Sequence, residues 1–374
     1  QLEKEITQYE AILGSETKLL QTIKADLRAI KKAYQDERRS TIEAEIEEIN
    51  INIEVMIPSE DVVVSVTREG YVKRTSLRSY AASSPDDLSL KENDVVVGII
   101  EMNTTDKILL FTNKGRFVAI PVYELPDIRW KDIGQHLSNL TALDSDEKII
   151  QCLPIREFKK DHYLIFFTKQ GMVKRSLVTE YDAKRYTRPL IAIQLKDDDE
   201  LIHVDDSTGD SQVFIVSNRG YGLWYQEAEI PVVGTRALGV IAIQLKDGEY
   251  VVNGQLFNET SSPHVFVMTQ RGACKRMALS EFAKSSRAKR GTVMLRELKG
   301  KPHRIRGFYL VYEQDNIYFR TKNNHQGTVY PLELPLSERL SNGSFVIDSD
   351  RDGEVEDVWK QVTYQQPFLE NRDS

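Results

Sequence analysis

The heptapeptide IAIQLKD stands at residues 191–197 and recurs without change at residues 241–247. The two copies are 50 residues apart, and chance identity over seven positions in a chain of 374 residues is negligible. Self-similarity at a fixed period is typical of repeat architectures, in which each copy is one supersecondary unit. The sequence therefore predicts a fold assembled from copies of a unit of about 50 residues.

A second motif has the same period and marks the start of each copy. An apolar run is followed by Thr or Ser, two polar residues and Gly, with a looser sixth copy in which three residues are inserted. The copies occupy residues 67–70, 112–115, 168–171, 217–220, 269–272 and, in the looser form, 321–327. Glycine adopts positive φ without a Cβ clash, so we expect each copy to be the turn of a β-hairpin.

The runs around these turns are typical of strands, and the segment before them is typical of helix. Runs such as VVVSV, ILLF, YLIFF and VFIV are short, β-branched and aromatic. A further strand, polar turn and strand follow the hairpin, as in RPLIAIQLKDDDEL. Residues 1–40 instead repeat apolar positions at spacings of three and four, with Ser15 as the predicted N-cap of a second helix. Six repeats of about four strands predict an all-β, propeller-like disk of six blades behind a short α-helical segment.

These patterns divide the chain into three predicted parts: residues 1–54, helical segment and linker; residues 55–366, the six repeats; and residues 367–374, a polar tail. Because Gln1 lies within the helical pattern, we expect the chain to be a fragment of a longer protein. No apolar run approaches the roughly 20 residues that span a bilayer, so no membrane contact is expected. Cys152 and Cys274 are expected to be buried thiols, and the singly scattered histidines predict no metal site.

Basic pairs recur in alternate repeats. Repeats one, three and five contain GYVKR, GMVKR and GACKR, and the pairs are 101 residues apart both times. They are Lys73 with Arg74, Lys174 with Arg175, and Lys275 with Arg276, whereas repeats two, four and six carry Val118 and Ala119, Leu223 and Trp224, and Tyr330 and Pro331. In a closed disk, equivalent positions lie on one ring, so these pairs are expected to form a positive edge despite the net charge of −7.

A regularly spaced positive edge suits the phosphate backbone of a curved duplex, and such contacts need no reading of bases. We expect binding that depends strongly on salt and little on DNA sequence. The predicted DNA contacts are Arg68, Lys73, Arg74, Arg78, Lys114, Arg116, Lys169, Lys174, Arg175, Lys184, Arg185, Arg188, Arg219, Arg236, Arg271, Lys275, Arg276, Arg287, Lys289 and Arg290.

Several of these stretches resemble a known family. VVVSVTREGYVKRTSL, ILLFTNKGR, YLIFFTKQGMVKRS and LGVIAIQLKDGEYVV are similar to the C-terminal β-pinwheel of DNA gyrase and topoisomerase IV A subunits. The helical stretch AILGSETKLLQTIKADLRAIKKAYQDERRS resembles the end of the breakage-reunion domain of the same subunits. The resemblance implies a six-bladed β-pinwheel that wraps double-stranded DNA round its outer edge and presents a transport segment to the cleavage gate.

The resemblance also implies how the whole enzyme is arranged. The catalytic tyrosine would lie upstream, so this fragment is expected to be non-catalytic and to need no cofactor. ATP hydrolysis would belong to the B subunit, and the complete enzyme would use Mg²⁺ and ATP. Self-association of the A subunit and its binding to the topoisomerase IV B subunit would give a heterotetramer, A2B2, in the cytoplasm at the nucleoid.

One departure from the family pattern favours its topoisomerase IV branch, of Gram-positive type, which decatenates and relaxes DNA. Gyrase A subunits carry a Gln-Arg-Arg-Gly-Gly-Lys-Gly-like box in the first repeat, whereas residues 80–90 here read YAASSPDDLSL. This stretch has no Arg or Gly and contains Asp86 and Asp87, so it cannot grip phosphate or close the blade in the same way. Two alternatives stay open: the wrapping domain of a gyrase A subunit, and a protein-interaction propeller without DNA binding, which the net negative charge favours.

Overall fold

The structure is a computed structural model that describes residues 1–36 and 57–365. The chain divides into two compact units, residues 1–53 and residues 54–374. The predicted boundary between residues 54 and 55 and the predicted tail, residues 367–374, lie outside the described residues.

The first unit contains two helices, α1 (Leu2–Leu13) and α2 (Glu16–Tyr34). Ser15 is the N-cap of α2, as predicted, with an extended backbone (φ −144°, ψ 111°). The apolar face of α2 is exposed, since Leu27 and Ile30 are both more than half accessible. Within the described residues, no helix combines the length and apolar character that crossing a membrane requires.

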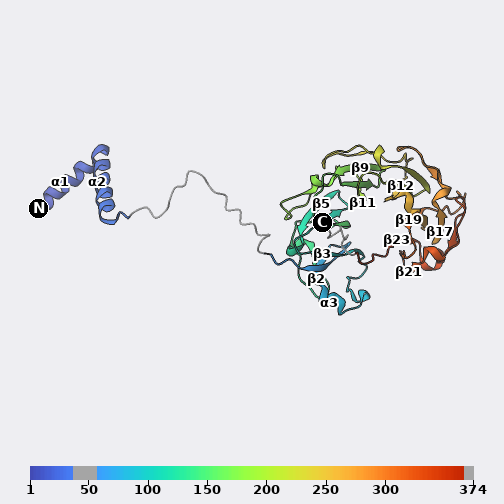
Figure 1. Cartoon of the computed structure of the whole chain (residues 1–374). Coiled ribbons are helices and arrows are strands. Elements are labelled where there is room, and N and C mark those ends of the chain that lie inside the picture. Colours follow the sequence, from blue (N-terminus) through green and yellow to red (C-terminus); the bar gives the residue numbers. More distant parts are fainter. Residues whose placement is uncertain (37–56, 366–374) are drawn as a thin grey trace. The chain divides into compact units, whose positions relative to one another are not determined.

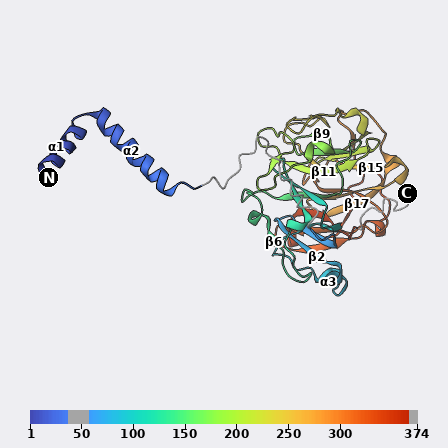
Figure 2. The same ribbon diagram turned by 60° about the vertical axis from the view of Figure 1, so that its left-hand side comes forward.

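The second unit consists of six antiparallel sheets that stand as blades around a ring (Figures 1 and 2). In pairing order, blade 1 contains β3 (Val96–Asn103), β1 (Asp61–Thr67), β2 (Tyr71–Ser76) and β6 (Gln135–His136); blade 2 contains β7 (Ile149–Ile155), β4 (Lys107–Thr112), β5 (Arg116–Pro121) and β10 (Leu190–Ile191); and blade 3 contains β11 (Leu201–Ser207), β8 (Tyr163–Thr168), β9 (Met172–Leu177) and β14 (Val240–Ile241). Blade 4 contains β15 (Val251–Phe257), β12 (Gln212–Ser217), β13 (Tyr221–Gln226) and β18 (Thr292–Val293); blade 5 contains β19 (Ile305–Val311), β16 (His264–Thr269), β17 (Ala273–Ala278) and β22 (Ser344–Phe345); and blade 6 contains β23 (Val355–Lys360), β20 (Ile317–Thr321) and β21 (Gln326–Val329).

Short helices occupy the connections between strands. They are α3 (Leu77–Ala81), α4 (Ser349–Asp352), η2 (Pro85–Asp87), η3 (Val122–Glu124), η4 (Leu137–Asn139), η5 (Val178–Tyr181), η6 (Glu227–Glu229), η7 (Glu259–Ser261), η8 (Leu279–Glu281) and η9 (Pro331–Glu333). The prediction of an all-β ring of six blades behind a short helical segment is therefore confirmed.

Apolar side chains fill the space between successive blades. The first strand named for each blade contacts its counterpart in the next blade, and β3, β11, β19 and β23 are labelled on the inner side of the ring in Figure 1. Val64 of blade 1 shares a buried cluster with Ile108 and Leu110 of blade 2, and similar clusters follow between the next blades as far as Phe266 of blade 5 and Phe319 of blade 6. Because both faces of a blade are covered, the central strands are continuous apolar runs rather than alternating ones.

The fourth strand of each of the first five blades comes from the following repeat. After β5 completes the hairpin of blade 2, the chain returns to blade 1, where β6 pairs with β2, His136 opposite Tyr71. β10, β14, β18 and β22 pair in the same way with β5, β9, β13 and β17. Each returning stretch is called here a crossing segment; residues 126–136, 182–191, 231–241, 283–293 and 335–345 cover blades 1 to 5 in that order. The crossing segments therefore form the outer edge of the ring.

The predicted hairpin turns are present, but the sixth uses a different residue. Five turn glycines have positive φ: Gly70 (89°), Gly115 (70°), Gly171 (82°), Gly220 (80°) and Gly272 (78°). In blade 6 the residue with positive φ is Asn324 (59°), and the strands pair with Arg320 opposite Gln326. Gly327 and Thr328 therefore stand where the basic pair stands in other blades, so the predicted match to Tyr330 and Pro331 is wrong by three residues. Asparagine tolerates the left-handed conformation, which a motif defined by glycine does not detect.

Among the described residues, blade 6 has three strands because the first repeat supplies no crossing strand. Asn93 (φ 63°) and Asp198 (φ 60°) are equivalent turn residues, so the Pro-Asp-Asp of η2 corresponds to Leu190, Ile191 and Ala192. Proline has no backbone N–H to donate, and carboxylates replace the apolar side chains of a borrowed strand. The stretch forms η2 and leaves the outer strand β21 unpaired on one side.

The last described residues join blade 6 to blade 1 instead. The backbone N–H of Gln365 donates to the carbonyl of Ile99 (3.0 Å), and the N–H of Glu101 donates to the carbonyl of Gln365 (3.0 Å). The ring of Tyr364 stacks on Tyr80 at a centroid distance of 5.1 Å. Residues 361–365 are therefore called the closing segment.

Candidate nucleic-acid interface

The three lysines of the repeated basic pairs lie inside the protein. Lys73, Lys174 and Lys275 are each no more than 1% exposed. The prediction that they face DNA phosphate on the outer edge is therefore wrong. Their regular spacing reflects an internal contact that alternate blades share, and the corresponding positions of blades 2 and 4, Val118 and Leu223, are buried as well.

Backbone carbonyl oxygens surround each of these amino groups. An ammonium has three hydrogens to donate, and each lysine Nζ has at least three carbonyl partners. The partners are Arg129 (3.2 Å), Trp130 (2.5 Å) and Asp132 (2.6 Å) for Lys73; Gly234 (3.2 Å), Thr235 (2.9 Å) and Ala192 for Lys174; and Met294 (2.5 Å), Arg339 (2.6 Å), Ser341 (2.6 Å) and Glu338 (3.4 Å) for Lys275. Burial lowers the pKa of Lys174 to about 7 and the pKa values of Lys73 and Lys275 to about 8.

The three neighbouring arginines are half-buried, and two of them, Arg175 and Arg276, bind groups of the protein. The guanidinium of Arg276 donates through Nε and Nη2 to the carbonyl of Leu334, at 3.1 and 2.7 Å. The guanidinium of Arg175 lies 4.7 Å from the ring centroid of Tyr163, and its Nη1 lies 3.6 Å from Oε1 of the buried Glu227. Arg74 is also half-buried, and its Nε is enclosed. The basic pairs therefore belong to the packing of the blades.

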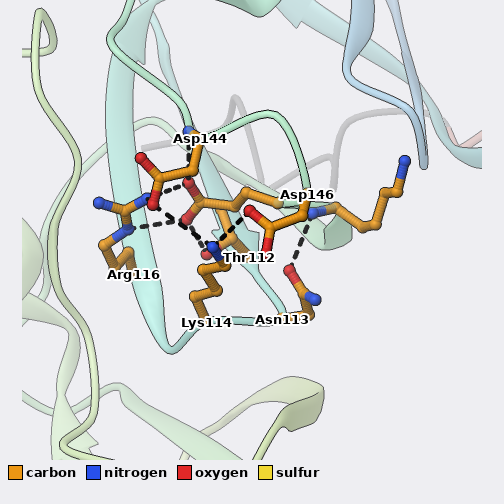
Figure 3. Close-up of polar contacts among 8 residues, drawn as sticks. Thr112, Asn113, Lys114, Arg116, Asp144 and Asp146 are labelled. Carbon is orange, nitrogen blue, oxygen red and sulfur yellow. Dashed lines mark hydrogen bonds and ion pairs between the residues drawn. The ribbon is translucent and has the colours of Figure 1, made fainter.

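Lys114 and Arg116, on the hairpin of blade 2, bind a group of carboxylates (Figure 3). Nζ of Lys114 lies 2.5 Å from Asp146 and 3.4 Å from Asp144. Nε of Arg116 donates to Glu147 (2.9 Å), and its Nη2 donates to Asp144 (2.7 Å). Three carboxylates against two cations leave this corner without positive charge, so it is a poor phosphate site.

Six further predicted residues have a partner within the protein and would have to exchange it for phosphate. The pairs are Arg68 with Asp357 (2.5 Å), Lys169 with Glu200 (3.2 Å), Arg219 with Glu249 (3.7 Å), Arg290 with Glu249, Arg271 with the carbonyl of Lys301 (2.9 Å) and Arg287 with the carbonyl of Glu229 (3.1 Å).

The other six predicted residues are exposed, and no described acidic group lies within 4.0 Å of their charged nitrogens. Five of them lie on neighbouring crossing segments and one on α3. They are Lys184, Arg185 and Arg188 over blade 2, Arg236 over blade 3, Lys289 over blade 4, and Arg78 on α3. Of the predicted residues without an acidic partner, five therefore lie on one arc of the outer edge, over blades 2 to 4, which is called here the basic arc.

Two exposed lysines beside the basic arc were not predicted. Lys196 and Lys246 follow the borrowed strands β10 and β14 and have no described acidic partner within 4.0 Å. Both stand in the repeated heptapeptide IAIQLKD, whose recurrence indicates the repeat period but not which of its residues are exposed. Asp197 and Asp198 come directly after Lys196. Its contribution to the positive potential is therefore smaller than that of the triad over blade 2, Lys184, Arg185 and Arg188.

No metal centre accompanies this surface in the described part of the chain, where no group of three or more His, Cys, Asp or Glu side chains could hold an ion. Cys152 and Cys274 are buried free thiols, as predicted. Burial raises the pKa of each thiol to about 12, so neither is poised as a nucleophile.

Comparison with known proteins assigns the ring to a family. The model of the DNA gyrase C-terminal domain, a β-propeller, matches residues 61–100, 106–156, 162–206, 211–258 and 263–311. The chain belongs to this family. The matched residues end before blade 6, the blade that departs from the others in its turn and its strand number.

Among curated relatives, the chain is similar to the A subunit of DNA topoisomerase 4. It is 50% identical to that of Bacillus subtilis (strain 168) over 365 residues, 98% of this chain and 45% of the relative. It is 42% identical to that of Staphylococcus epidermidis over 358 residues, 96% of this chain and 44% of the relative. The chain therefore spans less than half the length of these relatives.

Two solved structures have the same fold. A crystal structure of the C-terminal domain of DNA topoisomerase IV is 49% identical, with a TM-score of 0.78 over 82% of this chain and 94% of that one. A DNA gyrase A C-terminal domain is 23% identical, with a TM-score of 0.59 over 81% of this chain and 100% of that one, which shows the fold alone. The resemblance to the C-terminal region of type IIA topoisomerase A subunits, with the topoisomerase IV branch preferred, is confirmed.

Proposed function

We propose that the ring binds and bends double-stranded DNA along its outer edge, as the C-terminal domain of a topoisomerase IV A subunit. The observation that carries this proposal is the basic arc. Its five residues lie on crossing segments that cover three consecutive blades, and none has a described acidic partner within 4.0 Å. A duplex that follows the arc meets positive charge at successive blades, so its path curves with the ring.

The energetics of such binding are set by phosphate contacts. Smooth bending of a 20–30 bp site costs roughly 1–6 kcal/mol, which contacts along the arc must offset. Each neutralised phosphate releases counterions and adds about −0.9 to the slope of log K against log salt concentration. Because backbone contacts carry no base information, we expect little preference for DNA sequence.

Lys184, Arg185 and Arg188, the triad over blade 2, allow a direct test of the basic arc. Replacing Lys184, Arg185 and Arg188 with Ala should weaken DNA binding and reduce the salt slope by about 0.9 for each phosphate that the variant no longer neutralises. The measurement is the affinity of the 374-residue chain for a long duplex at several salt concentrations. The matched control is the double variant Lys301→Ala and Lys322→Ala, because these exposed lysines are paired with Asp350 and Glu354 outside the basic arc. Equal slopes for the triple variant and the unchanged chain would exclude the arc as the DNA site.

For the whole enzyme, we propose that the ring presents a transport segment for ATP-dependent decatenation and relaxation. The identity with topoisomerase 4 A subunits supports this role, as does the missing box in residues 80–90. The catalytic tyrosine would lie upstream, and the topoisomerase IV B subunit would complete an A2B2 assembly that uses Mg²⁺ and ATP on chromosomal DNA in the cytoplasm. Deleting residues 57–374 from the full A subunit should slow decatenation by the assembled enzyme; negative supercoiling by the undeleted enzyme would instead favour the gyrase alternative.

A protein partner is the second candidate function, and one observation favours it. The crossing segment over blade 5 exposes Leu336, Leu340 and Phe345, each more than half accessible. Exposed apolar clusters often mark protein contacts. The absence of any salt-dependent shift of plasmid DNA by the chain would support this function over DNA binding.

A further inference from the structure

We propose that Lys174 is a positioning residue for the basic arc: it holds the crossing segments of blades 2 and 3 in place and does not contact DNA. The inference rests on the proposed function, because the segments that it holds carry four of the five residues of the arc. Lys174 lies on β9 of blade 3 and is fully buried, so its amino group cannot reach a phosphate outside the ring.

The amino group of Lys174 joins two segments that are far apart in the sequence. It donates to the carbonyls of Gly234 (3.2 Å) and Thr235 (2.9 Å), the two residues directly before Arg236. It also donates to the carbonyl of Ala192, which directly follows the segment that carries Lys184, Arg185 and Arg188. One side chain therefore fixes the backbone beside Arg236 and the end of the segment of the blade 2 triad.

Neighbouring hydrogen bonds fix the same two segments beside Lys174. Oγ of Ser176 donates to the carbonyl of Val233 (2.6 Å), and the N–H of Val233 donates to the carbonyl of Arg175 (2.9 Å). The hydroxyl of Tyr181 donates to the carbonyl of Ala192 (3.0 Å), so that oxygen has two donors. β9 thus holds the crossing segment over blade 3, and Lys174 adds the contact that also reaches the end of the crossing segment over blade 2.

A buried lysine binds the covering segment in three blades, and the link to a second segment occurs twice, at Lys174 and Lys275, which argues against a chance contact. Lys73 binds the carbonyls of Arg129, Trp130 and Asp132 in the segment over blade 1. Lys275 binds those of Arg339 and Ser341 in the segment over blade 5, and that of Met294, which follows the segment over blade 4. In blade 6, which no crossing segment covers in the part of the chain that the structure describes, the residue at this position is Gly327.

The test is Lys174→Met, which keeps the length of the side chain and removes its donors. The matched control is Leu223→Met, the same position of blade 4, where the native residue is apolar. Hydrogen exchange should accelerate at least about tenfold at the amides of Val233, Ala237 and Ala242 in Lys174→Met and stay unchanged in Leu223→Met. Unchanged exchange in Lys174→Met would overturn the inference, whatever the DNA measurements show.

A double-mutant cycle with Arg236→Ala separates positioning from direct contact. If Lys174 acts through the segment, Lys174→Met weakens DNA binding severalfold in the native background and much less in the Arg236→Ala background. Losses that stay additive both with Arg236→Ala and with the blade 2 triple variant would mean a role independent of the arc and would overturn the inference. If Arg236→Ala and the blade 2 triple variant both leave DNA binding unchanged, the proposed function fails, while the exchange result still decides whether Lys174 holds the segments. Should Lys174→Met not fold, Lys275→Met, which removes the other link between two segments, gives the same exchange test at the amides of Ser337 and Val346.

Discussion

At the scale of single residues, the lysines show how a correct periodicity led to a wrong placement. The alternation of basic pairs is real, and its register with the fold suggested a surface ring. The partners of these lysines, however, are carbonyls that lie 18 to 66 residues further along the chain, in segments whose course no local pattern encodes. A lysine in the middle of a strand can be recognised as buried only when the segment that covers the strand is known.

The buried lysines predict an unusual dependence of stability on pH. Burial lowers the folded-state pKa of Lys174 to about 7 from 10.5, although the nearby Glu180 acts in the opposite direction. Between these values the unfolded chain binds more protons than the folded chain, so the free energy of unfolding contributed by Lys174 rises with pH. From pH 7 to pH 9, the native chain should gain roughly 2 kcal/mol relative to Lys174→Met. Denaturant unfolding of both proteins at the two pH values measures this difference, and a constant difference would contradict it.

At the scale of elements, the crossing segments depend on close approach to the strand below. In Gly134, Gly239, Gly291 and Gly343, an added Cβ would lie 2.8 Å or less from a backbone oxygen of the blade that is covered. These glycines come just before the borrowed strands, and three of them also have positive φ: Gly239, Gly291 and Gly343. Glycine therefore serves there as the residue that lets two backbones touch, a role that a search for hairpin turns does not detect.

Gly291→Ala tests this role against a matched glycine. Both Gly291 (φ 85°) and Gly248 (φ 73°) have positive φ, but a Cβ on Gly248 meets nothing within 4 Å, whereas one on Gly291 lies 2.6 Å from the carbonyl oxygen of Gly222. Gly248→Ala should cost about 1–2 kcal/mol of unfolding free energy, the strain of the left-handed backbone alone. Gly291→Ala should cost about 1–3 kcal/mol more, because the segment must lift off blade 4. Chemical denaturation of the two variants measures both costs, and equal values would show that the segment adapts freely.

At the scale of the whole molecule, the sequence predicted the number of blades and their order because these depend on local signals. The turn motif, the short β-branched runs and the N-cap Ser15 each lie within a few residues. The exchange of strands between blades was not predictable in this way, since β6 pairs with a strand more than 60 residues earlier. The three-stranded blade 6 was not predicted: residues 80–90 were expected only to differ from the gyrase box, whereas Asp86 and Asp87 stand where other repeats have a borrowed strand.

We expect the ring to be weakest where the closing segment joins blade 6 to blade 1. A chain that ends at Lys360 loses the bonds between Gln365 and β3 and the stacking of Tyr364 on Tyr80. The amide of Glu101 should then exchange faster, and the radius of gyration measured by small-angle X-ray scattering should increase as blades 1 and 6 separate. A chain that ends at residue 366 is the control. Unchanged exchange and an unchanged radius would mean that the remaining contacts, such as the ion pair of Arg68 with Asp357 and the hydrogen bond from Arg320 to the carbonyl of Asn93, hold these blades together without the closing segment.

The borrowed strands also limit how such a ring can change its size in evolution. A deletion that removes one repeat, from the start of its hairpin to the start of the next, takes away the outer strand of the blade before it and leaves the crossing segment of the next repeat facing a foreign partner. A repeat can be gained or lost without disrupting the ring only if the new neighbouring blade can pair with that crossing segment in the same way. Within residues 57–365 no segment crosses to blade 6, so this blade is free of the constraint, and extra or missing blades are most readily accommodated there.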